Sequence, residues 1–236
     1  MARPLPLGSR LAQIPRAVRW LIAVTALVSI ATAVSARSGA PILLNGLLMV
    51  SAVFRGQVWR LVTWVFYEMS PLALVFDCLT LYWFGSEVAR TLGRRAFLAG
   101  YFGLAVIAAI VTCLVGLGWQ AVTMGVYGGS WPVLVGVIVA WGMMFPDRPL
   151  RFWGIPLVGR HLIPIVVGGT VLFALFVGLA PFIPHFTSEA AVLAWLGPIK
   201  RTRAARNKDL RDRAARGEAW SFDDWFDKDK RRRKRD

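Results

Sequence analysis

The chain has 236 residues, of which 56% are hydrophobic and 17% charged, and its formal net charge is +15 at pH 7. A water-soluble domain of this length rarely needs so much apolar sequence, and here the charges collect at the two ends of the chain, outside the long apolar runs. The composition therefore argues against an ordinary soluble domain and indicates an integral protein of a lipid bilayer. We attribute the basic excess to membrane topology rather than to nucleic-acid binding.

Six apolar runs are candidate transmembrane helices, because a helix needs about 20 apolar residues to cross a bilayer. They lie at residues 20–34, 71–84, 96–117, 130–145, 161–182 and 190–199. The last run is short, so we expect its helix to begin earlier, around Phe186. The predicted fold class is all-α: a polytopic membrane protein with six transmembrane helices.

The segment between the first two runs, residues 35–69, is apolar only in patches. Gly, Pro, Asn and Arg residues interrupt it. An amphipathic segment lying in the membrane interface fits this pattern better than a seventh span does. A badly broken span is the alternative interpretation.

The distribution of basic residues predicts the topology. Arg and Lys residues cluster before the first run, after the second, after the fourth and in the tail, whereas residues 118–127 and 183–189 contain none. By the positive-inside rule both termini lie in the cytoplasm. We expect a cytoplasmic segment (1–19), a membrane domain (20–199) and a basic cytoplasmic tail (200–236) that attracts anionic lipid. A bacterial inner membrane fits this topology.

Five short motifs follow one another along the chain. They are "GQVWRLVTWVF", "LYWFG", "LGRRAFLAGYF", then "GGSW" where the fourth run opens, and "FIPHFTSEAAVLAWLGP" at the sixth. Over roughly residues 20–198 this series resembles the rhomboid superfamily of intramembrane serine proteases and their inactive relatives. The resemblance implies a rhomboid-like fold in which Trp59 and Arg60 brace the first loop on the interface.

The resemblance also identifies candidate catalytic positions. In active rhomboids a serine on the fourth helix is activated by a histidine on the sixth, because a serine hydroxyl is a poor nucleophile without a base. A histidine and an asparagine on the second helix help to stabilise the oxyanion. In this chain the serine is Ser130, but Trp131 replaces the glycine after it. Ala73 takes the place of the second-helix histidine, and Asp77 that of the asparagine.

The position of the base is ambiguous. The histidine of the sixth helix falls on Ser188, whereas a shift of one turn would make His185 the base. If Ser188 occupies the position of the catalytic histidine, the resemblance implies a degenerate, non-proteolytic member that binds transmembrane segments of client proteins. The alternative is an active rhomboid endopeptidase that uses Ser130 with His185. We expect neither a cofactor nor a metal.

Two of these residues have simpler interpretations. Ser130 suits the N-cap of a helix, and Pro132 fits a helix start. Asp77 lies inside an apolar run, and an ionisable residue there usually faces the protein interior. His185 and Arg60 are its candidate partners, and a plain interhelix hydrogen bond is the alternative.

Overall fold

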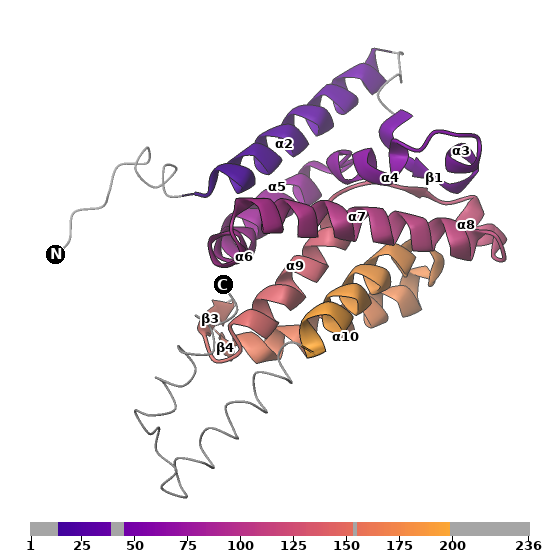
Figure 1. The fold of residues 1–236 in the computed structure, drawn as a ribbon. Coiled ribbons are helices and arrows are strands. Elements are labelled where there is room, and N and C mark those ends of the chain that lie inside the picture. Colours follow the sequence, from indigo (N-terminus) through magenta and orange to yellow (C-terminus); the bar gives the residue numbers. More distant parts are fainter. Residues whose placement is uncertain (1–13, 39–44, 153–154, 199–236) are drawn as a thin grey trace, which may run out of the picture. The chain divides into compact units, whose positions relative to one another are not determined.

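A computed structural model describes residues 14–38, 45–152 and 155–198. Most of the N-terminal segment and the whole basic tail (200–236) lie outside these described residues, so what the sequence indicates for them stays a prediction. The chain divides into two compact units, Met1–Ala194 and Trp195–Asp236. The first unit is built almost entirely of helices (Figure 1).

Among the described residues, four helical segments are long and apolar enough to cross a membrane. They are α2 (Arg16–Arg37), the continuous segment Pro71–Leu92, α7 (Arg94–Gly116) and α10 (Gly159–Val177). Pro71–Leu92 comprises α5 (Pro71–Thr80), the π-helical turn η3 (Leu81–Gly85) and α6 (Ser86–Leu92). The prediction of a helical membrane protein is confirmed, with four helices of spanning length.

The two other predicted spans correspond to shorter helices. One is α9 (Trp131–Met144), which is apolar but has only 14 residues. The other is a helix at 183–198. Their crossing of the bilayer, and with it the count of six spans, remains a prediction.

Several predicted helix ends were wrong. The fifth run does not continue to residue 182, because Gly178 has φ +106° and ends α10 at Val177. A 3₁₀ turn, η4 (Ala180–Phe182), follows, and the last helix begins at residue 183 rather than near Phe186. The second span continues to Leu92, where Gly93 with φ +82° separates it from α7.

The segment before the second span is a chain of short elements. Its described part contains β1 (Leu48–Met49), α3 (Val50–Phe54), α4 (Arg60–Thr63) and the 3₁₀ turn η2 (Trp64–Phe66). Each is too short to cross a bilayer, so a broken seventh span is not formed by these residues. Their location in the interface stays a prediction.

The described residues form two small antiparallel strand pairs, one between distant segments and one local hairpin. Strand β1 pairs with β2 (Val126–Tyr127), which follows the short α8 (Gln120–Thr123). This pairing holds the first loop against the residues that lead into α9. A hairpin of β3 (Pro149–Phe152) and β4 (Ile155–Val158) joins α9 to α10.

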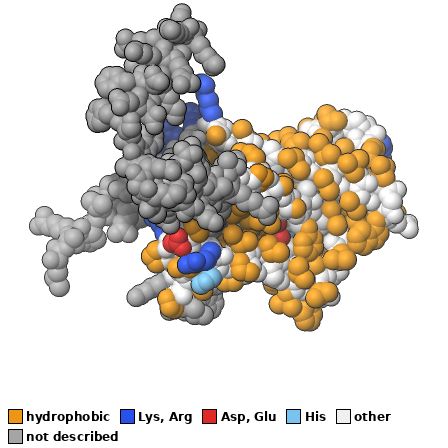
Figure 2. All heavy atoms as spheres, turned by 60° about the horizontal axis from the view of Figure 1, so that its bottom comes forward, with side chains coloured by type: hydrophobic (Ala, Val, Ile, Leu, Met, Phe, Trp, Pro, Cys, Tyr) orange, Lys and Arg blue, Asp and Glu red, His pale blue; other side chains and the backbone are white. Residues whose placement is uncertain are grey.

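Helix α9 is the centre of the core. Its residues 132–142 are all buried, and it packs against α5, α6, α7 and α10. Most large apolar side chains exposed on the unit lie on α2, α5, α7 and α10. Figure 2 shows hydrophobic side chains covering much of one face, with few charged groups among them. Such a surface suits lipid rather than water.

Candidate functional site

The two glycines of "GGSW", Gly128 and Gly129, lie directly before α9, where neighbouring atoms leave no room for larger side chains. A Cβ atom on Gly128 would lie 2.4 Å from Leu47 Cδ2, and one on Gly129 would lie 2.3 Å from Glu68 Oε2. Gly129 also has φ +95°, which side-chain-bearing residues rarely adopt. The Gly129 amide donates to the carbonyl oxygen of Trp64 at 3.0 Å. These contacts fix the backbone directly before Ser130.

Ser130 occupies the N-cap position of α9, as its simpler interpretation predicts. Its hydroxyl, however, makes no capping hydrogen bond. It donates instead to Oδ2 of Asp77, and both residues are fully buried. Asp77 lies on α5, which begins at the N-cap Ser70. The partner of Asp77 is therefore Ser130, not His185 or Arg60.

Two further polar residues border this pair. The Glu68 carboxyl lies close to Asp77, and the Tyr101 hydroxyl lies close to Ser130. We call Glu68, Asp77, Tyr101 and Ser130 the Asp77 cluster. Tyr101 is 1% exposed, and within the described residues neither its hydroxyl nor Oδ1 of Asp77 has a hydrogen-bond partner of good geometry. The cluster thus contains several carboxyl oxygens but few hydrogen-bond donors.

The position of Glu68 is set by its backbone neighbours. Its amide donates to Oγ of Ser29 on α2 at 3.1 Å, and its Oε1 accepts from the Met69 amide at 3.1 Å. Burial raises the pKa of the Glu68 carboxyl from its ordinary value of 4.5, although its polar neighbours, among them the Met69 amide, oppose the shift. Glu68 therefore tends to hold its proton more strongly than an exposed glutamate.

The length of α9 indicates how deep the Asp77 cluster lies. Fourteen helical residues rise about 21 Å, whereas the hydrocarbon core of a bilayer is about 30 Å thick. If the opposite end of α9 reaches one edge of that core, Ser130 lies roughly 9 Å inside the other edge. The cluster would then be at a depth where unpaired polar groups are costly.

His185 and Ser188 lie on the last helix, near but not in the cluster. Their helix starts close to β2, since Tyr127 Oη donates to the carbonyl of Ala180 at 3.4 Å. The ring of His185 packs on Phe182 with centroids 5.0 Å apart, and its Nδ1 is buried without a partner in the described part of the chain. The described residues include no hydrogen bond from Ser130 to His185.

Ser188 packs at a different level of α9. A Cβ atom built on Gly136 would lie 3.4 Å from the Cβ of Ser188, six residues along α9 from Ser130. Ser188 is fully buried, and its hydroxyl is also without a partner among the described residues. Six helical residues correspond to about 9 Å, so Ser188 is not next to Ser130 along this axis.

The sequence matches the model of a known protein family. Residues 55–197 match the family model described as Rhomboid domain, which is more than half of the sequence. The chain belongs to the rhomboid family. No curated protein matches it.

Within this rhomboid, the other positions carried over from the family lie around the cluster. Ala73 is half-buried on α5, one turn before Asp77, and has no side-chain group that can donate. Trp131 directly follows Ser130 and is 40% exposed. On the last helix Ala190 and Ala194 are exposed, and Ser188, Glu189 and Val192 form the buried face.

The Trp59–Arg60 pair holds the first loop of this rhomboid together. Arg60 is only 4% exposed, and its guanidinium donates to Gln57 Oε1 at 2.6 Å and to the Leu47 carbonyl at 2.5 Å. Trp59 is half-exposed and donates from Nε1 to the Asn45 carbonyl at 3.3 Å. Both side chains therefore bind the chain just before β1, a contact compatible with the bracing role.

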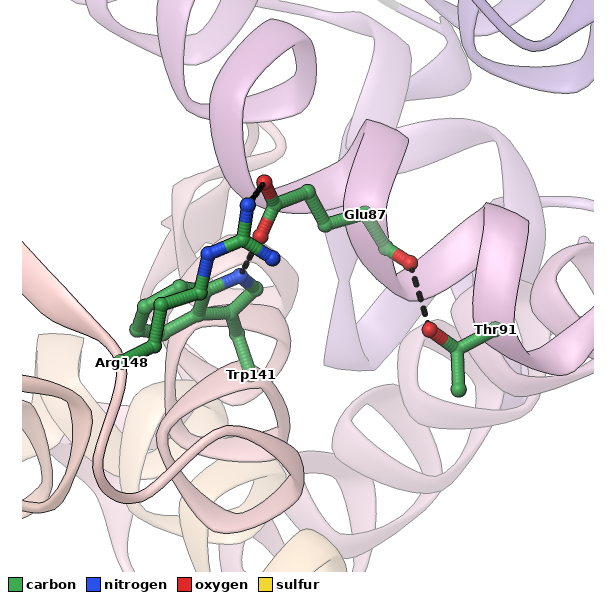
Figure 3. A network of polar contacts seen from close by, with 4 residues as sticks. All are labelled: Glu87, Thr91, Trp141 and Arg148. Atoms are coloured by element: carbon green, nitrogen blue, oxygen red, sulfur yellow. Dashed lines mark hydrogen bonds and ion pairs between the residues drawn. The ribbon is translucent and has the colours of Figure 1, made fainter.

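A second polar network lies at the opposite end of α9 (Figure 3). Glu87 of α6 accepts from Nε1 of Trp141 at 2.6 Å and pairs with Arg148 at 2.8 Å, while Thr91 donates to its backbone carbonyl. Helix α9 is joined to α6 here and to α5 at Ser130, so side-chain contacts hold it at both ends.

Sequence reasoning missed three acidic or phenolic residues that matter here. Glu68 is the one acidic residue in 35–69, and it stands just before the Ser-Pro start of a helix, which is a usable signal. Tyr101 carries no signal, because it lies in a long apolar run. Glu189 is 2% exposed and accepts a 2.6 Å hydrogen bond from Thr170 of α10.

Proposed function

We propose that this rhomboid does not cleave proteins but binds transmembrane segments of client membrane proteins, through the side between α5 and α10. The observation that carries the proposal is the hydrogen bond from Ser130 to Asp77. In the active family members a histidine takes the proton of the serine. Here the hydroxyl is bonded to the residue that stands in the place of an oxyanion-hole asparagine.

The replaced residues also weaken transition-state stabilisation. A protease must stabilise the negative charge that develops on the substrate oxygen, and losing one donor costs on the order of 10²–10³ in rate. Ala73 has no donor, and an ionised Asp77 repels an oxyanion. Trp131 adds bulk where the family has glycine, next to the backbone that a substrate must approach.

The surfaces of α5 and α10 supply a binding region for an apolar helix. Both expose large apolar side chains, among them Leu72 and Phe76 on α5 and Phe173 and Phe176 on α10. Helix α10 is also the least buried of the four spanning-length helices, at 17% of its span against 33–39% for the others. Much of its surface is therefore available to pack against a client helix.

The test uses the purified full chain in phosphatidylcholine bilayers with a synthetic leucine–alanine transmembrane peptide. A photo-crosslinking amino acid replaces Phe76 on α5 or Leu172 on α10, and Leu114 on α7, which is equally exposed, is the control. We expect capture of the peptide from α5 and α10 well above capture from α7. Equal capture at all three positions would mean ordinary lateral collisions and would refute the proposal.

An active serine endopeptidase is the second candidate function. The buried Nδ1 of His185, which has no partner among the described residues, favours it, because a serine nucleophile needs a base. A fluorophosphonate probe distinguishes the two functions. Labelling that disappears in Ser130→Ala and in His185→Ala would establish an activated serine, whereas we expect no labelling beside a labelled active rhomboid.

The membrane orientation belongs to the same proposal. With both termini in the cytoplasm, Ser130 and the start of the last helix lie toward the outer side, and the Glu87 network lies toward the cytoplasm. The same proposal places the protein in a bacterial inner membrane and has its basic tail attracted to anionic lipid.

A further inference from the structure

Four exposed arginines lie at the beginnings of two helices that pack together. Arg16 and Arg19 belong to the first turn of α2, and Arg94 and Arg95 are the first two residues of α7. Helix α2 packs against both α6 and α7, and Figure 1 shows it beginning near the turn where α6 ends and α7 begins. We call these four residues the α2–α7 arginines. They place four positive charges at one end of the membrane domain.

No acidic residue in the described part of the chain pairs with the α2–α7 arginines. The acids between residues 14 and 198 are Glu68, Asp77, Glu87, Asp147 and Glu189. Glu87 pairs with Arg148, and Asp147 pairs with Arg160. The other three lie in the Asp77 cluster or against Thr170 on α10. The charges of the α2–α7 arginines are therefore not balanced by the residues that the structure describes.

The beginning of α10 provides a contrast within the same protein. Its second residue, Arg160, has an acidic partner, Asp147, at 3.1 Å. The first turns of α2 and α7 contain no acidic residue. Moreover, Arg16 and Arg19 are three residues apart and so lie on neighbouring positions of one helix face, where like charges repel each other. An anion bound between these side chains would remove that repulsion.

An apolar surface adjoins the arginines on both helices. Trp20 directly follows Arg19 and is 51% exposed. Its ring packs edge-on against Phe102 of α7, with centroids 6.5 Å apart, so α2 and α7 are in contact here. Tryptophan suits the boundary between lipid headgroups and hydrocarbon. A molecule bound to the arginines would therefore find a place for an anionic group and, next to it, a place for an apolar body.

We propose that the α2–α7 arginines bind the headgroup phosphate of an anionic phospholipid, with its acyl chains against the apolar surface at Trp20. A guanidinium group binds phosphate well because it presents parallel N–H donors to two oxygens. All four arginines are exposed, so a headgroup reaches them from the bilayer without entering the protein. This site is separate from the attraction of the basic tail, and it does not depend on client binding.

A lipid fits this position better than a soluble phosphate does. Helices α2 and α7 both have spanning length, so their ends lie near the depth of the headgroups. Lipid headgroups are concentrated at that depth, and anionic ones attract basic residues near the surface. The exposed Trp20 adds an apolar contact that inorganic phosphate cannot use.

The test measures which lipid lies beside Trp20. A photo-crosslinking amino acid replaces Trp20 in the full chain, and the protein is placed in phosphatidylcholine bilayers. These bilayers contain equal amounts of an alkyne-bearing phosphatidylglycerol and an alkyne-bearing phosphatidylcholine. We expect the phosphatidylglycerol probe to be captured at least about fivefold more than the other. The variant Arg16→Gln, Arg19→Gln, Arg94→Gln, Arg95→Gln should capture both probes equally.

Two controls separate this site from a general attraction of anionic lipid. The crosslinker at Ile165, which is 49% exposed and lies about two turns into α10, reports lipid near an arginine that already has an acidic partner. The preference there should be clearly smaller. Arg37→Gln, Arg55→Gln removes two exposed arginines from the far end of α2 and from the first loop, and it should keep the preference at Trp20.

Several outcomes would overturn this inference without touching client binding. One is equal capture of the two probes by the wild type at Trp20, and another is an equal preference at Trp20 and Ile165, which needs no variant. A preference that survives the loss of all four arginines would also overturn it. Loss of the preference when inorganic phosphate is added would identify a soluble anion as the ligand instead of a lipid. Unchanged capture of the phosphatidylcholine probe shows that a variant remains folded.

Discussion

The hydroxyl of Ser130 donates a hydrogen bond to Asp77, which lies 53 residues earlier in the chain on another helix. This bond joins α9 to α5 at a fully buried site. It also occupies the hydroxyl that the family's chemistry would use as a nucleophile. The same contact thus contributes to the stability of the fold and bears on the function.

Removing one partner of this hydrogen bond should lower the free energy of unfolding more than replacing both partners by apolar residues does. Ser130→Ala leaves the carboxyl of Asp77 buried without its donor, which typically costs about 1–3 kcal/mol of unfolding free energy. The double variant Ser130→Ala, Asp77→Leu has no orphaned polar group and should lose less than the sum of the two single changes. Denaturation of the purified protein in mixed micelles measures all four proteins, and strictly additive losses would contradict the coupling.

Gly129 should not tolerate alanine. At φ +95° a side chain is strained, and its Cβ would overlap Glu68 Oε2, so Gly129→Ala should destabilise the fold by more than about 1 kcal/mol. Gly129→Ala combined with Glu68→Ala removes the overlap but not the strain, and it should recover only part of the loss. Gly103→Ala is the control, since space is open around Gly103 on α7.

Glu68 should make stability depend on pH. Burial raises its folded-state pKa above the ordinary 4.5, so the folded protein binds the proton more strongly than the unfolded chain does. The contribution of Glu68 to stability is therefore fully present below about pH 4.5 and is lost as the pH rises through the folded-state pKa. Glu68→Gln should flatten this part of the profile of unfolding free energy against pH. Identical slopes in the two proteins would show that other groups cause the dependence.

The two contacts of Glu87 should respond differently to salt. Its pair with Arg148 is half-exposed, so Arg148→Ala should cost no more than about 1 kcal/mol, and the cost should shrink in 1 M salt. Trp141→Phe removes the hydrogen bond from a residue only 2% exposed, and salt should leave its cost nearly unchanged. A salt-sensitive loss in Trp141→Phe would mean that its contact with Glu87 is solvated.

The elements that the sequence predicts well are those set by local hydropathy. Four apolar runs become helices of spanning length because a bilayer requires every backbone group to be bonded within the segment. The end of α10 was missed because Gly178 lies inside an apolar stretch and terminates the helix by its backbone conformation, which hydropathy does not register.

The composition of the site was harder to predict. Ser130 and Asp77 were both singled out, but the resemblance gave each a separate role, and only the packing of α5 against α9 brings them together. Glu68 joins them through contacts with Ser29 and Gly129 that come from two other parts of the chain. Long-range contacts of this kind leave no periodic pattern in a sequence.

The shortness of α9 has a consequence for engineering this protein. If α9 crosses the bilayer, about 9 Å of the hydrocarbon core beyond Ser130 is occupied by backbone that is not helical, and such backbone is stable there only where protein covers it. The pairing of β1 with β2 and the Trp64–Gly129 hydrogen bond provide part of that cover. The buried parts of this loop, residues 46–50 and 64–65, should therefore resist the deletions and insertions that surface loops usually accept.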